Sequence, residues 1–231
     1  MMKRIGIVSL AILLVIFMAS AATAFNPFGS KKDDGKKVDV DGLSKRSASL
    51  LNNVQSATIS FAEGIVLVQI AVGQKAEAEK LQQSIANAKE KKGDKNATKA
   101  LVGEVNNATA SLNNVDLASQ VNKEKAQESL GISILKIGIG VILDGFAAKT
   151  ASDLLQESQA ALKQASWGAV GKVKEVIDVA QFVVQEIPPQ ANNLRQYSGK
   201  LIDYGKTVGI TVDPETIKKQ AEEKMAAASE G

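Results

Sequence analysis

The chain contains no cysteine and no histidine among its 231 residues. The absence of cysteine excludes disulfide bonds, thiolate metal sites and a lipid anchor on a cysteine. The absence of histidine removes the side chain that most often serves as a general base or transition-metal ligand. Catalytic arrangements that pair serine or cysteine with histidine are therefore excluded. We expect no enzymatic activity, no metal and no cofactor.

Aromatic residues and prolines are also scarce, with six Phe, two Tyr, one Trp and four Pro. Alanine, glutamine, lysine and glutamate are plentiful, and these residues favour helices over strands. Apolar residues recur at alternating spacings of three and four, which is typical of helices that pack through one seam, as in a coiled coil. The predicted fold is all-α, an elongated antiparallel helical bundle built on two long helices with three or four shorter ones.

The first 24 residues have the three-part layout of a secretory signal peptide. Lys3 and Arg4 precede an apolar run over residues 5–18, and small residues occupy positions 22–24. We predict cleavage after Ala24 and export to the periplasm or the cell exterior, because signal peptidase needs small side chains before the cut. Retention as a membrane anchor is the alternative, since the uncharged stretch is long enough to span a bilayer.

Two of the 28 basic residues lie in the leader, so the exported chain has 26 basic residues against 25 acidic ones. A near-neutral balance gives no electrostatic footprint for nucleic acid. Residues 25–42 contain Pro27, three glycines and mixed charge without apolar periodicity, which predicts a flexible linker. We assign residues 43–210 to a helical bundle domain and residues 211–231 to a C-terminal polar helix or tail.

The apolar pattern predicts two long helices, over 43–92 and 115–165, because neither range contains proline. The basic residues and glycine at 91–93 are a sound C-terminal stop for the first. We expect the shorter helix over 167–187 to end at Pro188 and Pro189. We expect the shorter helix over 215–229 to begin after an Asp213 cap and to dock loosely. The shorter predicted helices cover 97–112, 167–187, 191–208 and 215–229.

A row of small residues runs along each long predicted helix at a spacing of seven. The first row is Ala57, Gly64, Ala71 and Ala78, and the second is Gly131, Gly138, Gly145 and Ser152. Each glycine costs a helix about 1 kcal/mol relative to alanine, so several on one stripe need a structural reason. Small residues let two helix axes approach closely. We therefore predict that the two rows face each other as the helix-packing residues of an antiparallel pair.

Three charged residues interrupt apolar stretches, namely Glu63, Lys136 and Asp144. Lys136 and Asp144 are eight residues apart, so they lie near one helix face two turns from each other. One hypothesis is a buried polar locus that contacts a ligand, responds to protons or lines a pore. The other, which we favour, is that these residues point outward or form an inter-helix ion pair that fixes the register.

Glycine-rich and acidic motifs fall short of known binding sites. Residues 168–172 lack the spacing of a phosphate loop and the Ser or Thr that follows its lysine. Residues 138–140 lack a preceding strand and the third glycine of a dinucleotide site. Residues 39–42 lack the later ligands of a calcium loop, and we interpret them as a turn that leads into a helix. No catalytic, cofactor-binding or metal-binding residue is predicted.

The composition and pattern favour an exported, non-enzymatic helical-bundle protein that acts as a scaffold, adaptor or assembly accessory in the cell envelope. Its partner would be another envelope protein or a second copy of itself. The alternative is a membrane-active bundle, pore-forming or lipid-interacting, that inserts residues 59–73 and 130–148. Membrane contact is not favoured, because helices with polar outer faces are typical of soluble bundles. An apolar-ligand carrier and an enzyme without histidine have less support.

Overall fold

The computed structural model describes residues 39–121, 123–210 and 212–229. These residues form α-helices and no strand, so the predicted all-α class is confirmed. The predicted leader (1–24) and most of the predicted linker lie outside the described residues. The helices are α2 (Val40–Ala71), α3 (Lys75–Glu90), α4 (Lys95–Asn113), α5 (Leu117–Gln120), α6 (Lys123–Leu162), α7 (Trp167–Thr207) and α8 (Pro214–Ser229).

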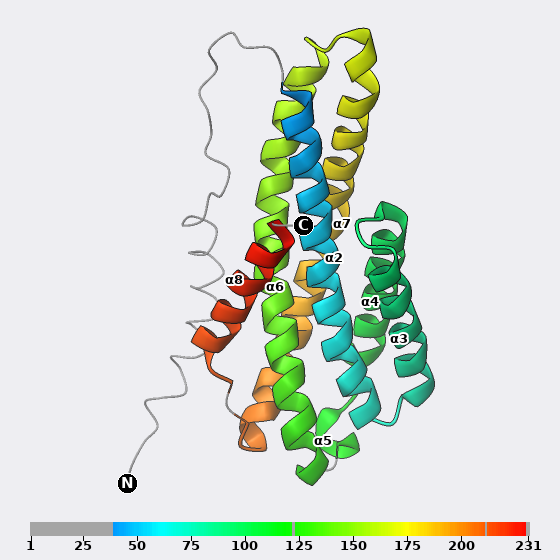
Figure 1. The fold of residues 1–231 in the computed structure, drawn as a ribbon. Helices are drawn as coiled ribbons and strands as arrows, with labels where there is room; N and C mark the ends of the chain where they lie inside the picture. Colours follow the sequence, from blue (N-terminus) through cyan, green and yellow to red (C-terminus); the bar gives the residue numbers. More distant parts are fainter. Residues whose placement is uncertain (1–38, 122, 211, 230–231) are drawn as a thin grey trace.

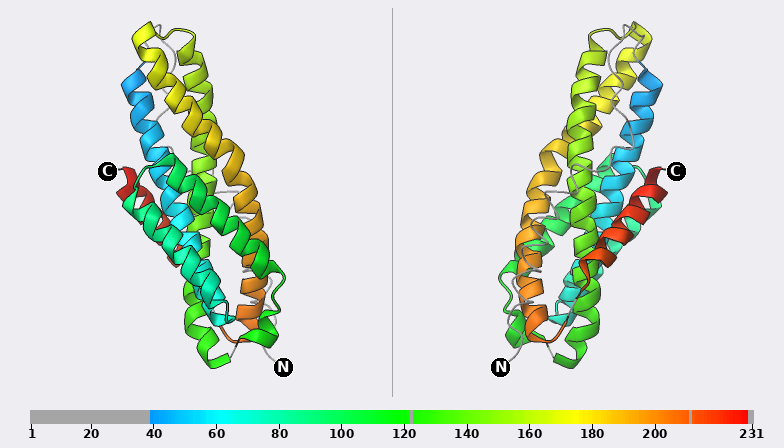
Figure 2. Two further views of the ribbon diagram at one scale, coloured as in Figure 1. Left: turned by 90° about the vertical axis from the view of Figure 1, so that its right-hand side faces the viewer. Right: turned by 90° about the vertical axis from the view of Figure 1, so that its left-hand side faces the viewer.

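Three long helices, α2, α6 and α7, lie side by side along the length of the molecule (Figure 1). α2 and α6 run in opposite directions, because Arg46 pairs with Glu157 whereas Glu63 pairs with Lys136. α3 and α4 cover one side of this group, and α8 crosses the other side against α6 (Figures 1 and 2). The prediction of two long helices missed α7, which has 41 residues.

α2 begins at Val40, three residues earlier than predicted. The Asp39 carboxylate accepts a hydrogen bond from the Gly42 backbone N–H at 2.9 Å, which caps the first turn. Residues 40–42 therefore belong to the helix rather than to the predicted linker. The same cap accounts for the acidic motif at 39–42 without a bound ion.

The predicted helix over 43–92 is wrong, because the chain turns back after Ala71. Gly73 adopts a positive φ of 83°, and the Gln74 N–H donates to the Gln69 carbonyl at 2.8 Å, which closes the end of α2. The predicted helix over 115–165 is also divided, because Val121 is extended between α5 and α6. The stop predicted at 91–93 is confirmed: α3 ends at Glu90 and Gly93 has φ 73°.

Pro188 and Pro189 lie inside α7 and do not end it, contrary to the prediction. Both rings are on the exposed side of the helix, whereas Ile187 before them and Leu194 after them are fully buried. Burial on both sides of the proline pair therefore holds the helix together despite two missing backbone donors. Figure 2 shows that α7 changes direction along its length, as expected at such a site.

α8 is docked, in contrast to the predicted loose tail. Asp213 caps it through hydrogen bonds from the backbone N–H groups of Glu215 and Thr216, as the sequence predicts. Ile217 and Ala221 are buried against α2 and α6, in an apolar cluster with Ala57 and Leu143. The few apolar residues of α8 are spaced to meet this surface, so a mostly polar helix can still pack.

The bundle contains two further apolar clusters, one toward each end. The three-helix cluster is built mainly on the first half of α2, the second half of α6 and the first half of α7. The five-helix cluster is built on the second half of α2, the first half of α6 and the second half of α7, together with α3 and α4. The molecule is therefore thicker at the end where α3 and α4 are added (Figure 1).

Candidate functional site

The structure separates the three charged residues that interrupt the apolar stretches. Glu63 of α2 accepts a hydrogen bond from the Lys136 ammonium of α6 at 2.5 Å, so these two form an inter-helix ion pair. Asp144 lies two turns further along α6, fully buried, and has no hydrogen-bond partner among the described residues. The hypothesis of one buried polar locus therefore divides into two separate sites, and Glu63 and Lys136 form an inter-helix ion pair of the kind that the favoured alternative describes.

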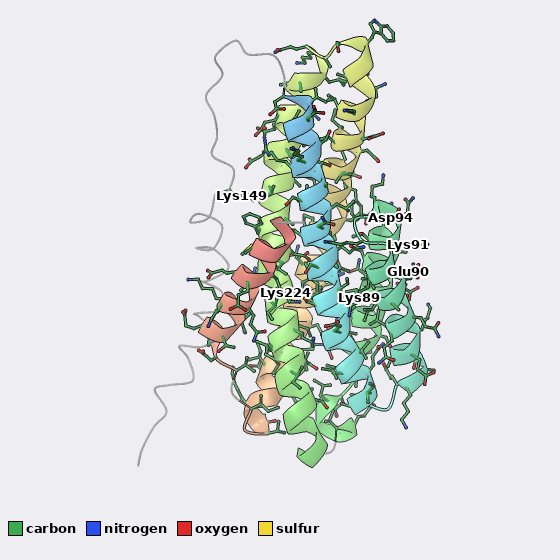
Figure 3. The ribbon with its side chains drawn as sticks, in the orientation of Figure 1. Lys89, Glu90, Lys91, Asp94, Lys149 and Lys224 are labelled. Carbon is green, nitrogen blue, oxygen red and sulfur yellow. The ribbon has the colours of Figure 1, made fainter. Side chains whose placement is uncertain are left out.

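The first site, which we call the lysine cluster, consists of Glu63, Lys89, Lys136 and Lys224. Glu63 also accepts a hydrogen bond from Lys89 of α3 at 2.8 Å. Lys224 of α8 donates to the Ser60 hydroxyl at 2.9 Å and lies within electrostatic range of the other three charges. Figure 3 shows Lys89 and Lys224 on opposite sides of α2. Two ammonium groups thus bond to a single carboxylate and a third lies near them, and these residues come from four helices.

Burial and neighbouring charges together shift the pKa values of Glu63 and Lys224. Burial raises the pKa of Glu63, but the hydrogen bonds and charges of Lys136 and Lys89 outweigh burial and hold it below its usual value. Burial lowers the pKa of Lys224, the positive charges of Lys136 and Lys89 lower it further, and Glu63 opposes them. One carboxylate therefore does not balance the three lysines, and the cluster attracts anionic groups.

The second site is a polar layer, formed by Thr58, Asp144 and Gln190, in the middle of the core. All three side chains are fully buried, and each lies between residues of the two main apolar clusters. The apolar residues that flank the layer are Val54 and Phe61 on α2, Val141 and Ala147 on α6, and Ile187 and Leu194 on α7. The layer therefore divides the core at one level.

Most of the polar atoms in this layer have no hydrogen bond to a described residue. Both carboxyl oxygens of Asp144 and both polar atoms of the Gln190 amide are without such a partner, whereas the Thr58 hydroxyl donates to the Val54 carbonyl. Burial raises the pKa of Asp144 well above its usual value, and it raises the pKa of Tyr197 as well. The layer stabilises the protonated form of Asp144 and weakens the core when Asp144 ionises.

The two rows of small residues do not face each other as predicted. A Cβ at Gly64 would lie 2.8 Å from Ile137 Cγ1 and 3.1 Å from the Ser133 carbonyl oxygen, so α2 does approach α6 closely there. A Cβ at Gly138, however, would lie 3.0 Å from Ile217 of α8. Gly138 of the row on α6 therefore faces α8, a placement that the periodicity of the sequence does not predict.

The remaining members of these rows have varied surroundings. Ala57 and Ala78 are buried and Ala71 is half-buried, but Ala78 belongs to α3 because the chain turns at Gly73. A Cβ at Gly131 would lie 3.8 Å from Ile210, which is ordinary contact. A Cβ at Gly145 would meet no atom of the described residues within 4 Å, and Ser152 is exposed. Only part of each row is needed for close packing.

Sequence reasoning missed several residues that the fold makes important. Gly140 lies against Phe61, and its spacing from Gly138 placed it outside the predicted row. Lys224 was assigned to a polar tail, and Gln190 follows two prolines that were expected to end a helix. The sequence did carry a signal for Gln190. Ile187 and Leu194 flank it at helical spacing, so Gln190 is a polar residue on an apolar helix face.

Three large apolar side chains are exposed among the described residues. Trp167, the first residue of α7, is 98% exposed, while Ile70 and Ile132 are 47% and 42% exposed. The end of α6 and the beginnings of α2 and α7 lie together at the Trp167 end, as the Asp41–Lys172 and Arg46–Glu157 ion pairs show. Ile70 and Ile132 lie toward the opposite end of α2 and α6.

No group of three or more acidic side chains in the described part of the chain could hold a metal ion. Two described helices, α2 and the 129–162 part of α6, are long and apolar enough to cross a membrane. In their most apolar stretches, 67% and 56% of the residues are buried inside the protein, as in core helices.

No protein-family model, curated protein or solved structure matches this chain.

Proposed function

We propose that this chain is an exported, non-enzymatic helical bundle that acts as a scaffold, adaptor or assembly accessory in the cell envelope. The leader at residues 1–24 supports export to the periplasm or the cell exterior. The elongated bundle, with its antiparallel long helices, would serve as a rigid body that presents surfaces to other molecules. The observation that carries the proposal is the lysine cluster, because it combines excess charge with neighbouring exposed apolar residues.

The exposed isoleucines continue the surface of the lysine cluster toward the α2–α3 turn. Ile70 follows Glu63 by seven residues, and Ile132 precedes Lys136 by four, so each lies on the same helix face as its charged neighbour. Because Glu63 and Lys136 bond across the two helices, the isoleucines lie on adjoining faces. We call this surface, formed by the lysine cluster with Ile70 and Ile132, the partner face.

The chemistry of the partner face fits an amphipathic helix that carries carboxylates beside its apolar residues. An apolar stripe would cover Ile70 and Ile132, and the carboxylates would meet Lys89, Lys136 and Lys224. The long helices provide the parallel edges of such a docking surface. Charge complementarity of this kind mainly sets the choice of partner and the rate of association, and it weakens as salt increases.

The test is site-specific photo-crosslinking at position 132 in the native envelope, with two matched charge reversals on α3. Lys89→Glu reverses a lysine of the partner face, whereas Lys80→Glu reverses a similarly exposed lysine that pairs with Glu104 elsewhere. We expect Lys89→Glu to reduce the crosslinked product about tenfold and Lys80→Glu to leave it unchanged. Equal effects of the two substitutions would rule out the partner face.

The mass of the crosslinked product distinguishes a different envelope protein from a second copy of this chain. Self-association would also raise the mass measured by light scattering, and high salt would lower it again. Both outcomes fit a scaffold. A monomer that forms no crosslink at position 132 would contradict the proposal.

A second candidate function is membrane activity, with insertion of residues 59–73 and 130–148. The apolar length of α2 and α6 favours it. Burial of most of the apolar stretch of α2 means that the bundle would have to open first. Release of a dye from liposomes of several lipid compositions, measured from pH 4 to pH 8, tests this function directly. Intact liposomes under all conditions would exclude it.

A further inference from the structure

The Trp167 end of the bundle has the chemistry of a membrane-surface contact. Trp167 is the only tryptophan in the chain and is almost completely exposed where α7 begins. Its neighbours Ser166 and Gly168 are small and exposed, so the indole ring projects without cover from adjacent side chains. Tryptophan has an apolar body with one N–H donor, and it is enriched where a bilayer meets water.

The segment that carries the ring is positively charged, whereas Glu157 and Glu175 lie just beyond its two ends. Residues 158–174 contain three lysines, Lys163, Lys172 and Lys174, and no acidic residue. All three lysines are exposed. Lys172 also contacts Asp41 at 3.1 Å, but that carboxylate is itself 80% exposed, so the pair contributes little. Basic residues near a bilayer surface are attracted to anionic lipids.

The N-terminal part of the chain enters the bundle at this same end. The first described helix, α2, starts at Val40, and the Asp41–Lys172 ion pair shows that its first turn lies beside the first turns of α7.

We propose that the Trp167 end binds the surface of an anionic lipid bilayer, with the indole ring at the level of the headgroups and the bundle extending away from the membrane. The lysines at 163, 172 and 174 meet the lipid phosphates. Asp39, Asp41, Glu157 and Glu175 are acidic residues at this same end, and they limit the strength of the contact. The proposal does not depend on the partner face, which lies toward the opposite end of α2 and α6, so either can fail alone.

The single tryptophan makes the test direct, because its fluorescence reports on this end alone. The protein is purified from the envelope, its N-terminus is determined by mass spectrometry, and it is mixed with vesicles of phosphatidylcholine with or without phosphatidylglycerol. We expect anionic vesicles to shift the emission to shorter wavelength, and lipids with bromine near the headgroup to quench it. Unchanged emission and no quenching with anionic vesicles would overturn the proposal.

Two charge-reversal pairs separate a specific contact from general attraction. Lys163→Glu with Lys174→Glu alters the Trp167 end, and Lys92→Glu with Lys219→Glu makes the same change in net charge on exposed residues elsewhere. We expect the first pair to weaken vesicle binding at least about tenfold and the second to have little effect. Equal loss from both pairs would overturn the proposal, because binding would then depend only on net charge.

Co-sedimentation of Trp167→Ala with the same vesicles tests the ring itself. Because Trp167 is exposed, this substitution should leave the melting temperature unchanged while reducing the bound fraction. Undiminished binding would overturn the role of the indole. If envelope proteins shift the fluorescence but lipid vesicles do not, the Trp167 end binds a protein and the lipid proposal is wrong.

Discussion

Phe61 of α2 lies directly against Gly140 of α6, and the ring occupies the space that a side chain at position 140 would need. A Cβ at Gly140 would lie 2.6 Å from both Cδ1 and Cε1 of the ring. Phe61 is fully buried, and close packing in a protein core limits how far its ring can move. This contact requires glycine at position 140, whereas a Cβ at position 145 of α6 would meet none of the described residues within 4 Å.

Gly140→Ala and Gly145→Ala should therefore have opposite effects on stability. We expect Gly140→Ala to destabilise the protein by about 1–3 kcal/mol, because it overpacks the core. We expect Gly145→Ala to stabilise it by about 0.5–1 kcal/mol, because alanine is the better helix former. Chemical denaturation of both variants measures the two changes. Stabilisation by Gly140→Ala would show that α2 and α6 are not packed as described.

Asp144→Asn should remove a pH-dependent weakness in the core. Burial raises the pKa of Asp144 in the folded state above its unfolded value near 3.8, so the folded state binds the proton more tightly. The free energy of unfolding of the parent protein therefore falls as pH rises from about 3.8 through the raised pKa. The variant should gain stability over the parent across that range. A stability difference that is the same at pH 4 and pH 8 would contradict this, and Asp153→Asn, an exposed α6 carboxyl, is the control.

Glu63→Gln should weaken the bundle in the opposite pH range. The pKa of Glu63 is held below its usual value of 4.5, so its contribution is present above pH 4.5 and is lost as pH falls through the lowered pKa. We expect a loss of about 1 kcal/mol at neutral pH, because the lysines around it are partly solvated. Thermal melts at pH 7 and pH 3 check this, and equal loss at both would exclude an electrostatic cause.

Ile217→Ala should release α8 from the bundle while the rest stays folded. Ile217 is 5% exposed and fills the space above Gly138, so its truncation removes about 2–4 kcal/mol of packing. Hydrogen exchange should become fast in residues 214–229 and remain slow in α2 and α6. Met225→Ala, a half-buried residue on the same helix, is the control. Slow exchange in α8 of the Ile217 variant would mean that other contacts hold it.

The sequence predicted the helical class, the position of α4 and the cap at Asp213, because these depend on local patterns. The predicted helix over 43–92 was wrong at Gly73, because the seven-residue apolar spacing continues through the turn there. Ala78 follows Ala71 at that spacing but belongs to α3. The prediction also failed at Pro188 and Pro189, because burial of distant residues stabilises a helix that local preference would end. Periodicity identifies a buried face but does not say which helix covers it.

The candidate site was only partly visible in the sequence for the same reason. Charges in apolar runs pointed to Glu63, Lys136 and Asp144, and the structure pairs the first two. Lys89 and Lys224 join that pair from helices that are remote in sequence. Gln190 joins the level of Asp144 only because α7 passes unbroken through two prolines. Tertiary packing, rather than composition, assembles both sites.

The pairing of α2 with α6 governs the order in which the chain can assemble. The contacts of Gly64 with Ile137 and of Phe61 with Gly140 join residues more than 70 positions apart. During synthesis, therefore, the apolar side of α2 is made long before α6, which covers it, and it stays exposed while α3, α4 and α5 are made. A high separation of this kind slows folding and leaves the nascent chain open to aggregation. Under the proposed export, the same delay would keep the chain unfolded during translocation, so slow assembly is compatible with secretion.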